Sequence, residues 1–193
     1  NGGAITTIVD TSGVFSGFQG LPVINRQGTV VFRADLKDGG QGIYTGRGAS
    51  LTTVADTSTL FRALALFPTI NDEETVAFSA TLKTGGAGIF TATGGKIMTI
   101  VDTNGPFESF RGALVNNART IIFYATPREG RLGISSGPDA IADRIISIGE
   151  PLFDSTVTDF ALNPVSLNDR DQIALRVRLA NDRQVIIRVD PIK

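Results

Sequence analysis

Four acidic residues recur along the chain and are the side chains best placed to do chemistry. Each follows a short apolar stretch, and a threonine follows the first three; the set is Asp10, Asp56, Asp102 and Glu150. If these carboxylates converged, they could supply the oxygen ligands that Ca²⁺ prefers, or they could accept hydrogen bonds from sugar hydroxyls. The structural alternative is that each Asp caps a turn. We therefore treat the set as candidate ligand-binding residues and assign no particular metal.

The composition excludes several other kinds of site. The chain has no His, Cys or Trp. A Ser-His-Asp or Cys-His nucleophile is therefore excluded, and zinc or copper would have only carboxylates as ligands. We predict no catalytic residue, and no cofactor beyond Ca²⁺ at the acidic set. The 18 basic and 19 acidic residues nearly balance, so the charge favours neither nucleic acid nor an anionic membrane. No apolar run reaches the roughly 20 residues of a membrane span.

Three weaker constellations also have ordinary structural interpretations. Asp154 and Asp159 are the nearest candidates for a glycosidase carboxylate pair, but they resemble ordinary loop acids. A set of asparagines is typical of turns: Asn25, Asn71, Asn116 and Asn168. Aromatic residues in the connections are expected to pack between sheets, and if exposed they would mark a partner or sugar-stacking surface. They are Phe15, Phe18, Phe61, Phe67, Phe107, Phe110, Phe153 and Phe160.

An internal repeat orders these residues. Its anchor positions are Phe32, Phe78, Phe123 and Leu175. An asparagine stands seven residues before each anchor, and an isoleucine stands eleven residues after it. A period in the forties predicts a stacked or radial array of units that each contain a few strands. Each unit reads as four short strands separated by Asn- and Gly-containing turns. The Ser58–Leu66 stretch is interpreted as a loop.

The two ends of the chain complement each other. Residues 4–10 resemble a fourth strand with no unit before them, and Val185–Asp190 resembles a third strand with no fourth after it. We predict that the first segment completes the last unit and closes a ring, because closure removes an open sheet edge. The prediction is an all-β, four-bladed β-propeller with four strands per blade. It forms a single domain, 1–193, with units at about 11–56, 57–102, 103–150 and 151–193, plus the closing strand 4–10.

The alternation of the second strands favours a different architecture. Val30 and Phe32 alternate with Arg33 and Asp35, and the last unit also alternates. Propeller blades bury both faces, so a polar second face fits a β-prism or a pseudo-symmetric barrel better. Both are kept as alternatives.

The units resemble a bacterial tandem-repeat family with the pattern Asn-x-x-Gly-x-Val-x-Phe. Asn25–Phe32 matches this pattern in full. The other copies depart from it at Glu74, Arg119, Asp171 and Leu175. The family occurs in exported or surface proteins of cyanobacteria and planctomycetes, and it has no assigned activity. There is also a looser similarity to Tol-type propellers. The resemblance implies a propeller-like fold and a secreted or cell-surface location.

The expected function is a non-enzymatic binding or scaffold module of an exported bacterial protein. We expect a monomer with a protein or glycan partner, no nucleic acid and no membrane span. One alternative is a carbohydrate-binding, lectin-like propeller. A second is a hydrolase that works through carboxylates, and a third is half of an eight-bladed ring closed by dimerisation.

Overall fold

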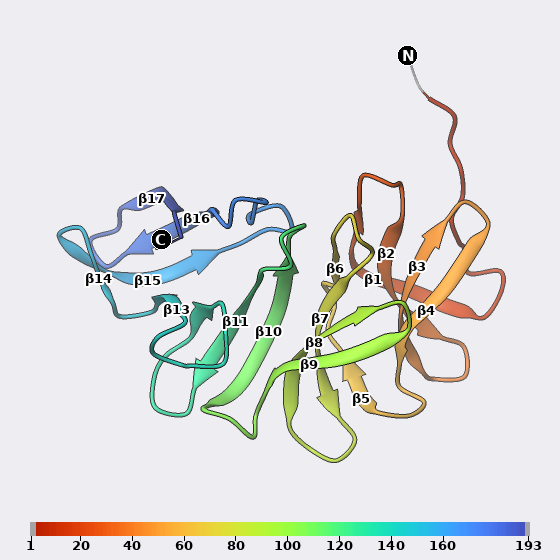
Figure 1. Ribbon diagram of the computed structural model, residues 1–193, viewed down its shortest axis with the longest axis horizontal. Helices are drawn as coiled ribbons and strands as arrows, with labels where there is room; N and C mark the ends of the chain where they lie inside the picture. The colour runs from red at the N-terminus through yellow and green to blue at the C-terminus, as the bar shows by residue number, and fades with distance from the viewer. Residues whose placement is uncertain (1–2, 192–193) are drawn as a thin grey trace.

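Four antiparallel sheets follow one another along the chain in the computed structural model, which describes residues 3–191 (Figure 1). The first sheet contains β1 (Phe15–Ile24), β2 (Val30–Leu36), β3 (Gln41–Arg47) and β4 (Ser50–Asp56). The second contains β5 (Phe61–Leu64), β6 (Thr69–Ile70), β7 (Val76–Leu82), β8 (Ala87–Thr93) and β9 (Lys96–Asp102), and both β5 and β6 pair with β7. This sheet corrects the loop expected at Ser58–Leu66, which contains β5.

The third sheet contains β10 (Phe107–Val115), β11 (Ile121–Pro127), β12 (Gly133–Ser135) and β13 (Arg144–Ser147). The fourth contains β14 (Pro151–Leu152), β15 (Ser155–Ala161), β16 (Ile173–Leu179) and β17 (Gln184–Val189). The predicted all-β class and propeller-like arrangement of four sheets are confirmed. Residues 1–2 and 192–193 of the predicted domain lie outside the described part.

The repeated asparagine builds the turn between the two inner strands of each unit. In the first unit, the Asn25 carbonyl accepts a hydrogen bond from Gly28 N at 3.1 Å, and its side-chain Oδ1 accepts one from Thr29 N at 2.9 Å. Gly28 adopts φ 82°, a left-handed conformation that glycine reaches without strain. The equivalent residues Glu74, Arg119 and Asp171 are also left-handed, with φ of 59°, 67° and 60°. The same turn therefore persists where the repeat lacks its glycine.

The hydrophobic core lies between consecutive sheets. Ile43 of the first sheet packs with Phe78 and Phe90 of the second, while Ile89 of the second packs with Phe123 of the third. Phe61 meets Phe78 and Phe90 edge-on, with ring centroids 5.6 and 5.0 Å apart. A third cluster joins the last two sheets through Ile122, Ile134, Leu175 and Val177. The two middle sheets therefore bury both faces, as propeller blades do.

The fourth sheet explains the polar alternation in the sequence. In β16, Leu175 and Val177 are buried against the third sheet, while Ala174 and Arg178 are exposed on the opposite face. Within residues 3–191, no further sheet covers that face, which points to solvent. In the first sheet, by contrast, Arg33 is buried and its Nη1 lies 2.9 Å from Asp35 Oδ1. Only in the fourth sheet does the alternation therefore mark an open side of the ring, and neither case requires a prism or a barrel.

The predicted closing strand 4–10 is wrong. Residues 3–14 form no strand, and the fourth sheet consists of β14–β17 alone. Instead, Ile8 and Val9 pack beside Phe15, Phe32 and Tyr44 on the free face of the first sheet. The segment leaves the molecule on the side away from the fourth sheet (Figure 1). The physical reason is proximity, since the segment directly precedes β1 and covers an aromatic face that no sheet of the described residues covers.

Candidate functional site

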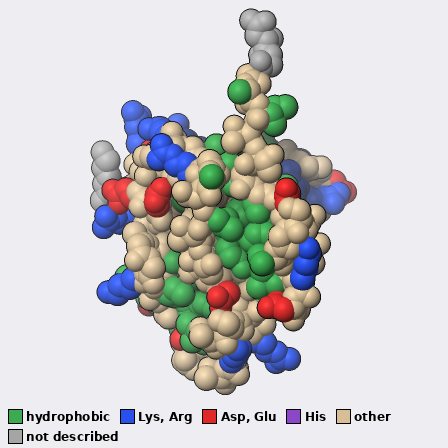
Figure 2. All heavy atoms as spheres, turned by 90° about the vertical axis from the view of Figure 1, so that its right-hand side faces the viewer, with side chains coloured by type: hydrophobic (Ala, Val, Ile, Leu, Met, Phe, Trp, Pro, Cys, Tyr) green, Lys and Arg blue, Asp and Glu red, His purple; other side chains and the backbone are tan. Residues whose placement is uncertain are grey.

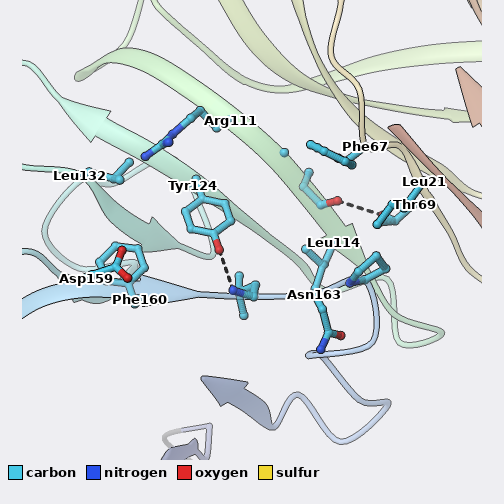
Figure 3. Close-up of a pocket in the computed structure, with 14 residues that line it drawn as sticks. Leu21, Phe67, Thr69, Arg111, Leu114, Tyr124, Leu132, Asp159, Phe160 and Asn163 are labelled. Atoms are coloured by element: carbon cyan, nitrogen blue, oxygen red, sulfur yellow. Dashed lines mark hydrogen bonds between the residues drawn. The ribbon is translucent and has the colours of Figure 1, made fainter. Parts of the chain in front are cut away.

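The innermost strands bring residues of all four units around one hollow, which we call the axial pocket. Its volume is about 460 Å³, and Figure 3 shows the side chains around it. Its walls are mainly apolar and come from distant parts of the sequence. They include Leu21 on β1, Phe67 before β6, Leu114 on β10, Leu132 before β12, Phe160 on β15 and Leu162 directly after it. Leu21 and Phe67 keep 57% and 48% of their surface exposed, so apolar area remains open to a ligand.

Tyr124 on β11 is the central polar group of the axial pocket. Its ring stacks on Phe160 with centroids 6.0 Å apart and an interplanar angle of 13°. Its hydroxyl accepts a hydrogen bond from Leu162 N at 2.6 Å. Burial raises the pKa of the Tyr124 phenol above its ordinary value of 10.0, although the Leu162 hydrogen bond and the Arg111 charge act in the opposite direction. The phenol therefore stays neutral at physiological pH and fixes the end of β15.

Arg111 on β10 brings a positive charge to the axial pocket. Its guanidinium carbon lies 5.9 Å from the centroid of the Tyr124 ring, which is within cation–π range. Among residues 3–191, Arg111 forms no salt bridge. Asp159, which also lines the pocket, is paired with Arg176 at 2.8 Å. The uncompensated charge of the pocket is therefore positive, and it stands beside apolar walls.

The turn asparagines link neighbouring units next to the axial pocket. Asn25 Nδ2 donates to the carbonyl of Asn71 at 3.0 Å, Asn71 Nδ2 to that of Asn116 at 2.9 Å, and Asn116 Nδ2 to that of Asn168 at 2.8 Å. Asn168 Nδ2 turns back to its own loop and donates to Gln172 Oε1 at 2.9 Å. The predicted turn role is therefore confirmed, and the asparagines also connect the units in a chain that stays open.

The residues after the asparagines form a second chain. Asp72 Oδ1 accepts from Arg26 N at 2.8 Å, Asn117 Oδ1 from Asp72 N at 2.7 Å, and Asp169 Oδ1 from Asn117 N at 2.9 Å. The backbone hydrogen bond from Asn117, together with its side-chain bond, lowers the pKa of the Asp169 carboxyl. These turns line a smaller hollow of about 290 Å³ that shares Pro164 with the axial pocket.

The candidate acids of the repeat each cap a turn. Asp10, Asp56 and Asp102 accept a hydrogen bond at Oδ1 from the backbone N of the residue two positions on, at 2.8, 2.8 and 2.9 Å. The Ser12 hydrogen bonds lower the pKa of the Asp10 carboxyl. Glu150 accepts from Ser147 N at 2.9 Å and pairs with Arg144 at 2.6 Å.

In the described part of the chain, no three acidic side chains form a group that could hold a metal ion. The geometry of the four acids matches the turn-capping alternative, and their ligand-binding role stays a prediction. Asp154 is exposed in the turn between β14 and β15, and Asp159 lies at the axial pocket.

The aromatic residues divide into two groups. Those buried between or against the sheets are Phe15, Phe61, Phe107 and Phe160, and their predicted packing role is confirmed. Phe110 is half-buried against the core between the second and third sheets. Phe18, Phe67 and Phe153 are exposed by 42%, 48% and 61%. Of these three, Phe67 lines the axial pocket.

Sequence reasoning missed Arg111 and Tyr124. Tyr124 follows the repeat anchor, where the other units carry Arg33, Ser79 and Arg176. This departure from the other three units was the available signal. Arg111 gave none, because it stands in a strand whose relation to the axis only the fold reveals.

Comparison with known proteins identifies a family of unknown function, DUF7453, whose model matches residues 3–185. No curated protein sequence matches the chain. Two solved structures are similar. A hypothetical protein from Leishmania major shares 13% identity at a TM-score of 0.42, covering 96% of this chain and 66% of that one. MPT-4, a mannose phosphorylase from Leishmania mexicana in complex with phosphate ion, shares 12% identity at a TM-score of 0.41, covering 96% of this chain and 68% of that one.

The chain thus spans about two thirds of each matched structure. Within residues 3–191, no helix is long and apolar enough to cross a membrane.

Proposed function

The chain belongs to the DUF7453 family of unknown function, and we propose that it is a non-enzymatic binding module whose axial pocket takes a small amphiphilic anion. The observation that carries this proposal is Arg111, a cation without a carboxylate partner in the described part of the chain, at an apolar pocket. A volume of about 460 Å³ lies within the usual range of about 300–1,000 Å³ for small-molecule sites.

The physical argument combines two contributions. An apolar ligand surface would cover Leu21 and Phe67, which are only half-buried, and remove their area from water. An acidic group on the ligand would pair with Arg111, and a hydrogen bond to a charged group contributes about 1.5–3 kcal/mol. The resemblance of the repeats to exported bacterial proteins supports a secreted or cell-surface location as part of the same proposal.

A lectin-like function is the second candidate. The exposed ring of Phe67, with Asp159 and Asn163 on the same pocket, supports sugar binding. The covered faces of Tyr124 weigh against it, because Phe160 and Arg111 already occupy them. A carboxylate hydrolase would need two acids about 5–10 Å apart. Among the described residues that line the axial pocket, Asp159 is the only acid, and it is paired with Arg176.

Two dyes of similar shape test the main proposal. The anion 8-anilinonaphthalene-1-sulfonate carries the sulfonate that should pair with Arg111, and neutral N-phenyl-1-naphthylamine does not. We expect Arg111→Gln to weaken binding of the anion about 10- to 100-fold, from the loss of one charged hydrogen bond. The same variant should leave the neutral dye unchanged, while Leu21→Glu should weaken both.

Matched controls are available on the surface. Met98 is 53% exposed, against 57% for Leu21, and it lies on β9 away from the axial pocket. Arg62 is an exposed arginine on β5 that does not line the axial pocket. Met98→Glu and Arg62→Gln should leave the affinity for both dyes unchanged. Equal affinity of the wild type and Arg111→Gln for the anion would overturn the proposal. Binding of neutral glycans that Leu21→Glu abolishes, without binding of the anion, would favour the lectin-like function instead.

A further inference from the structure

The fourth sheet differs from the other three at its outer edge. In the first three sheets, the third strand pairs with an outer fourth strand, as β3 does with β4 and β8 does with β9. The carbonyls of Gln41, Ala87 and Leu132 accept hydrogen bonds from the outer side at 2.9–3.0 Å. Gln184 occupies the equivalent position at the start of β17. In the described part of the chain, β17 pairs only with β16.

The unpaired edge of β17 is apolar. The strand reads Gln-Val-Ile-Ile-Arg-Val and contains no proline. Its Ile186 is 77% exposed, whereas the equivalent residues Ile43, Ile89 and Ile134 are fully buried. The pairing of β17 with β16 alternates along the strand, so the N–H and C=O groups of Ile186 and Arg188 point to the free edge. Such an edge is a template for another strand.

The chain carries a sequence that fits this edge. Residues 5–11 read Ile-Thr-Thr-Ile-Val-Asp-Thr. The outer strand β4 with the residue after it contains Leu-Thr-Thr-Val-Ala-Asp-Thr, and β9 with its following residue contains Ile-Met-Thr-Ile-Val-Asp-Thr. Yet residues 5–11 form no strand, and Ile5 is 98% exposed.

Within one molecule, this segment is held on the opposite side of the opening, beside the first sheet. Figure 2 looks at the molecule from that side and shows the segment rising from a surface on which hydrophobic side chains gather.

We propose that residues 5–9 of a second copy of this chain add to the free edge of β17 as its fourth strand. In the first two sheets, the register of the outer strands places the incoming Val9, Thr7 and Ile5 opposite Ile186, Ile187 and Val189. The two edges would exchange backbone hydrogen bonds, and the incoming apolar residues would help to cover Ile186. The contact is head-to-tail, because each copy offers one segment and one edge.

Val185 limits the paired length. The other sheets have glycine at this position, and a Cβ added at Gly88 or Gly133 would lie 2.7 or 2.8 Å from a carbonyl oxygen of the outer strand. The incoming strand therefore pairs with Ile186–Val189 and diverges before Val185. In addition, Ile8 and Val9 must leave the first sheet before they bind. Both features make the association weak and dependent on concentration, in contrast to the monomer expected from the sequence.

Disulfide trapping tests the contact directly, because the chain has no cysteine of its own. A protein carrying Ile5→Cys is mixed with one carrying Val189→Cys under mild oxidation. We expect a cross-linked dimer, and we expect Ile186→Pro in the second protein to abolish it. Proline removes the N–H that faces the free edge and leaves the β16 bonds in place. Circular dichroism confirms that the Ile186→Pro protein is folded.

A matched control uses Ile141, which is also 77% exposed but lies outside the strands. Mixing Ile5→Cys with Ile141→Cys measures random collision. Cross-linking of the Val189 pair no faster than this control would overturn the proposal. So would a chain carrying both cysteines that closes on itself at every dilution, because the segment would then bind its own β17.

Light scattering gives a second measurement. The average mass of the wild type should rise above 20.4 kDa with concentration, and Ile186→Lys should suppress the rise while Ile141→Lys should not. A constant monomer mass at millimolar protein would also overturn the proposal. Binding of the dyes to the axial pocket should be unaffected by either variant, which separates this inference from the proposed function.

Discussion

The asparagine chain around the axis predicts a measurable difference between two residues that the sequence presents as equivalents. Asn71 is buried, with 4% of its surface exposed. Its Oδ1 accepts from Glu73 N and Thr75 N at 3.1 and 2.9 Å, and its Nδ2 donates to the Asn116 carbonyl of the next unit. Asn168 makes the same two turn bonds, but it is exposed, and its Nδ2 stays within its own turn.

Asn71→Ala removes three hydrogen bonds and leaves buried partners unpaired. At about 1 kcal/mol for each net hydrogen bond, the free energy of unfolding should fall by about 3 kcal/mol. For a chain of this size, each kcal/mol lowers Tm by about 2–4 °C, so the expected shift is about 6–12 °C. Asn168→Ala exposes its partners to water, which replaces the lost bonds, so we expect about 1 kcal/mol and a shift of about 2–4 °C.

Differential scanning calorimetry of the wild type and both variants measures these shifts. Asn168→Ala is the matched control, because it removes the turn bonds without touching the link between units. Equal Tm shifts for the two variants would refute the reasoning, since the link between units would then contribute nothing. A large shift for Asn168→Ala alone would place the stabilisation in the turn itself.

Three further outcomes follow from packing, backbone conformation and ionisation. Phe78 is fully buried between the first two sheets, so Phe78→Ala should lower the free energy of unfolding in a urea titration by about 3–5 kcal/mol. Phe153 is 61% exposed, so Phe153→Ala should change that free energy little. Gly85 and Gly86 both have positive φ, but only at Gly86 would an added Cβ meet another side chain, that of Thr103 after β9. Gly86→Ala should therefore lower Tm more than Gly85→Ala, and equal Tm shifts would contradict this. Because the raised pKa of Tyr124 means that the folded state disfavours the phenolate, its contribution to stability is complete below pH 10.0 and is lost as pH rises through the raised pKa. Thermal melts from about pH 9 to 12 should therefore show a steeper loss for the wild type than for Tyr124→Phe, and parallel curves would rule this out.

The repeat accounts for most of what the sequence revealed about the fold. The anchors Phe78, Phe123 and Leu175 fill the spaces between consecutive sheets, whereas Phe32 packs on the outer face of the first sheet. Each sheet contributes one anchor, so their recurrence counted the sheets correctly. The asparagine predicted its turn even where glycine is missing, because the side chain itself bonds the turn backbone. The alternation in Ile173–Leu179 correctly reported one wet face, but it could not show that this face borders an opening in the ring.

The site was largely hidden from the sequence. Leu21, Phe67 and Arg111 stand in three different units, and no local pattern relates them; they meet because the innermost strands converge on one axis. The acids Asp10, Asp56 and Asp102 showed the opposite. Their regular spacing suggested convergence, but each acid caps a separate turn.

The sequence by itself determined the number of sheets, the turn between the inner strands and the strand-like character of residues 5–9. These properties depend on periodicity and on contacts within about ten residues. Only the tertiary structure decided where residues 5–9 lie and whether the ring closes. Residues 5–9 could bind either the nearby aromatic face of the first sheet or the distant edge of β17. Which of the two they bind depends on distances in the folded molecule, and no local sequence pattern gives those distances. In the part of the chain that the structure describes, this competition leaves the edge of β17 free.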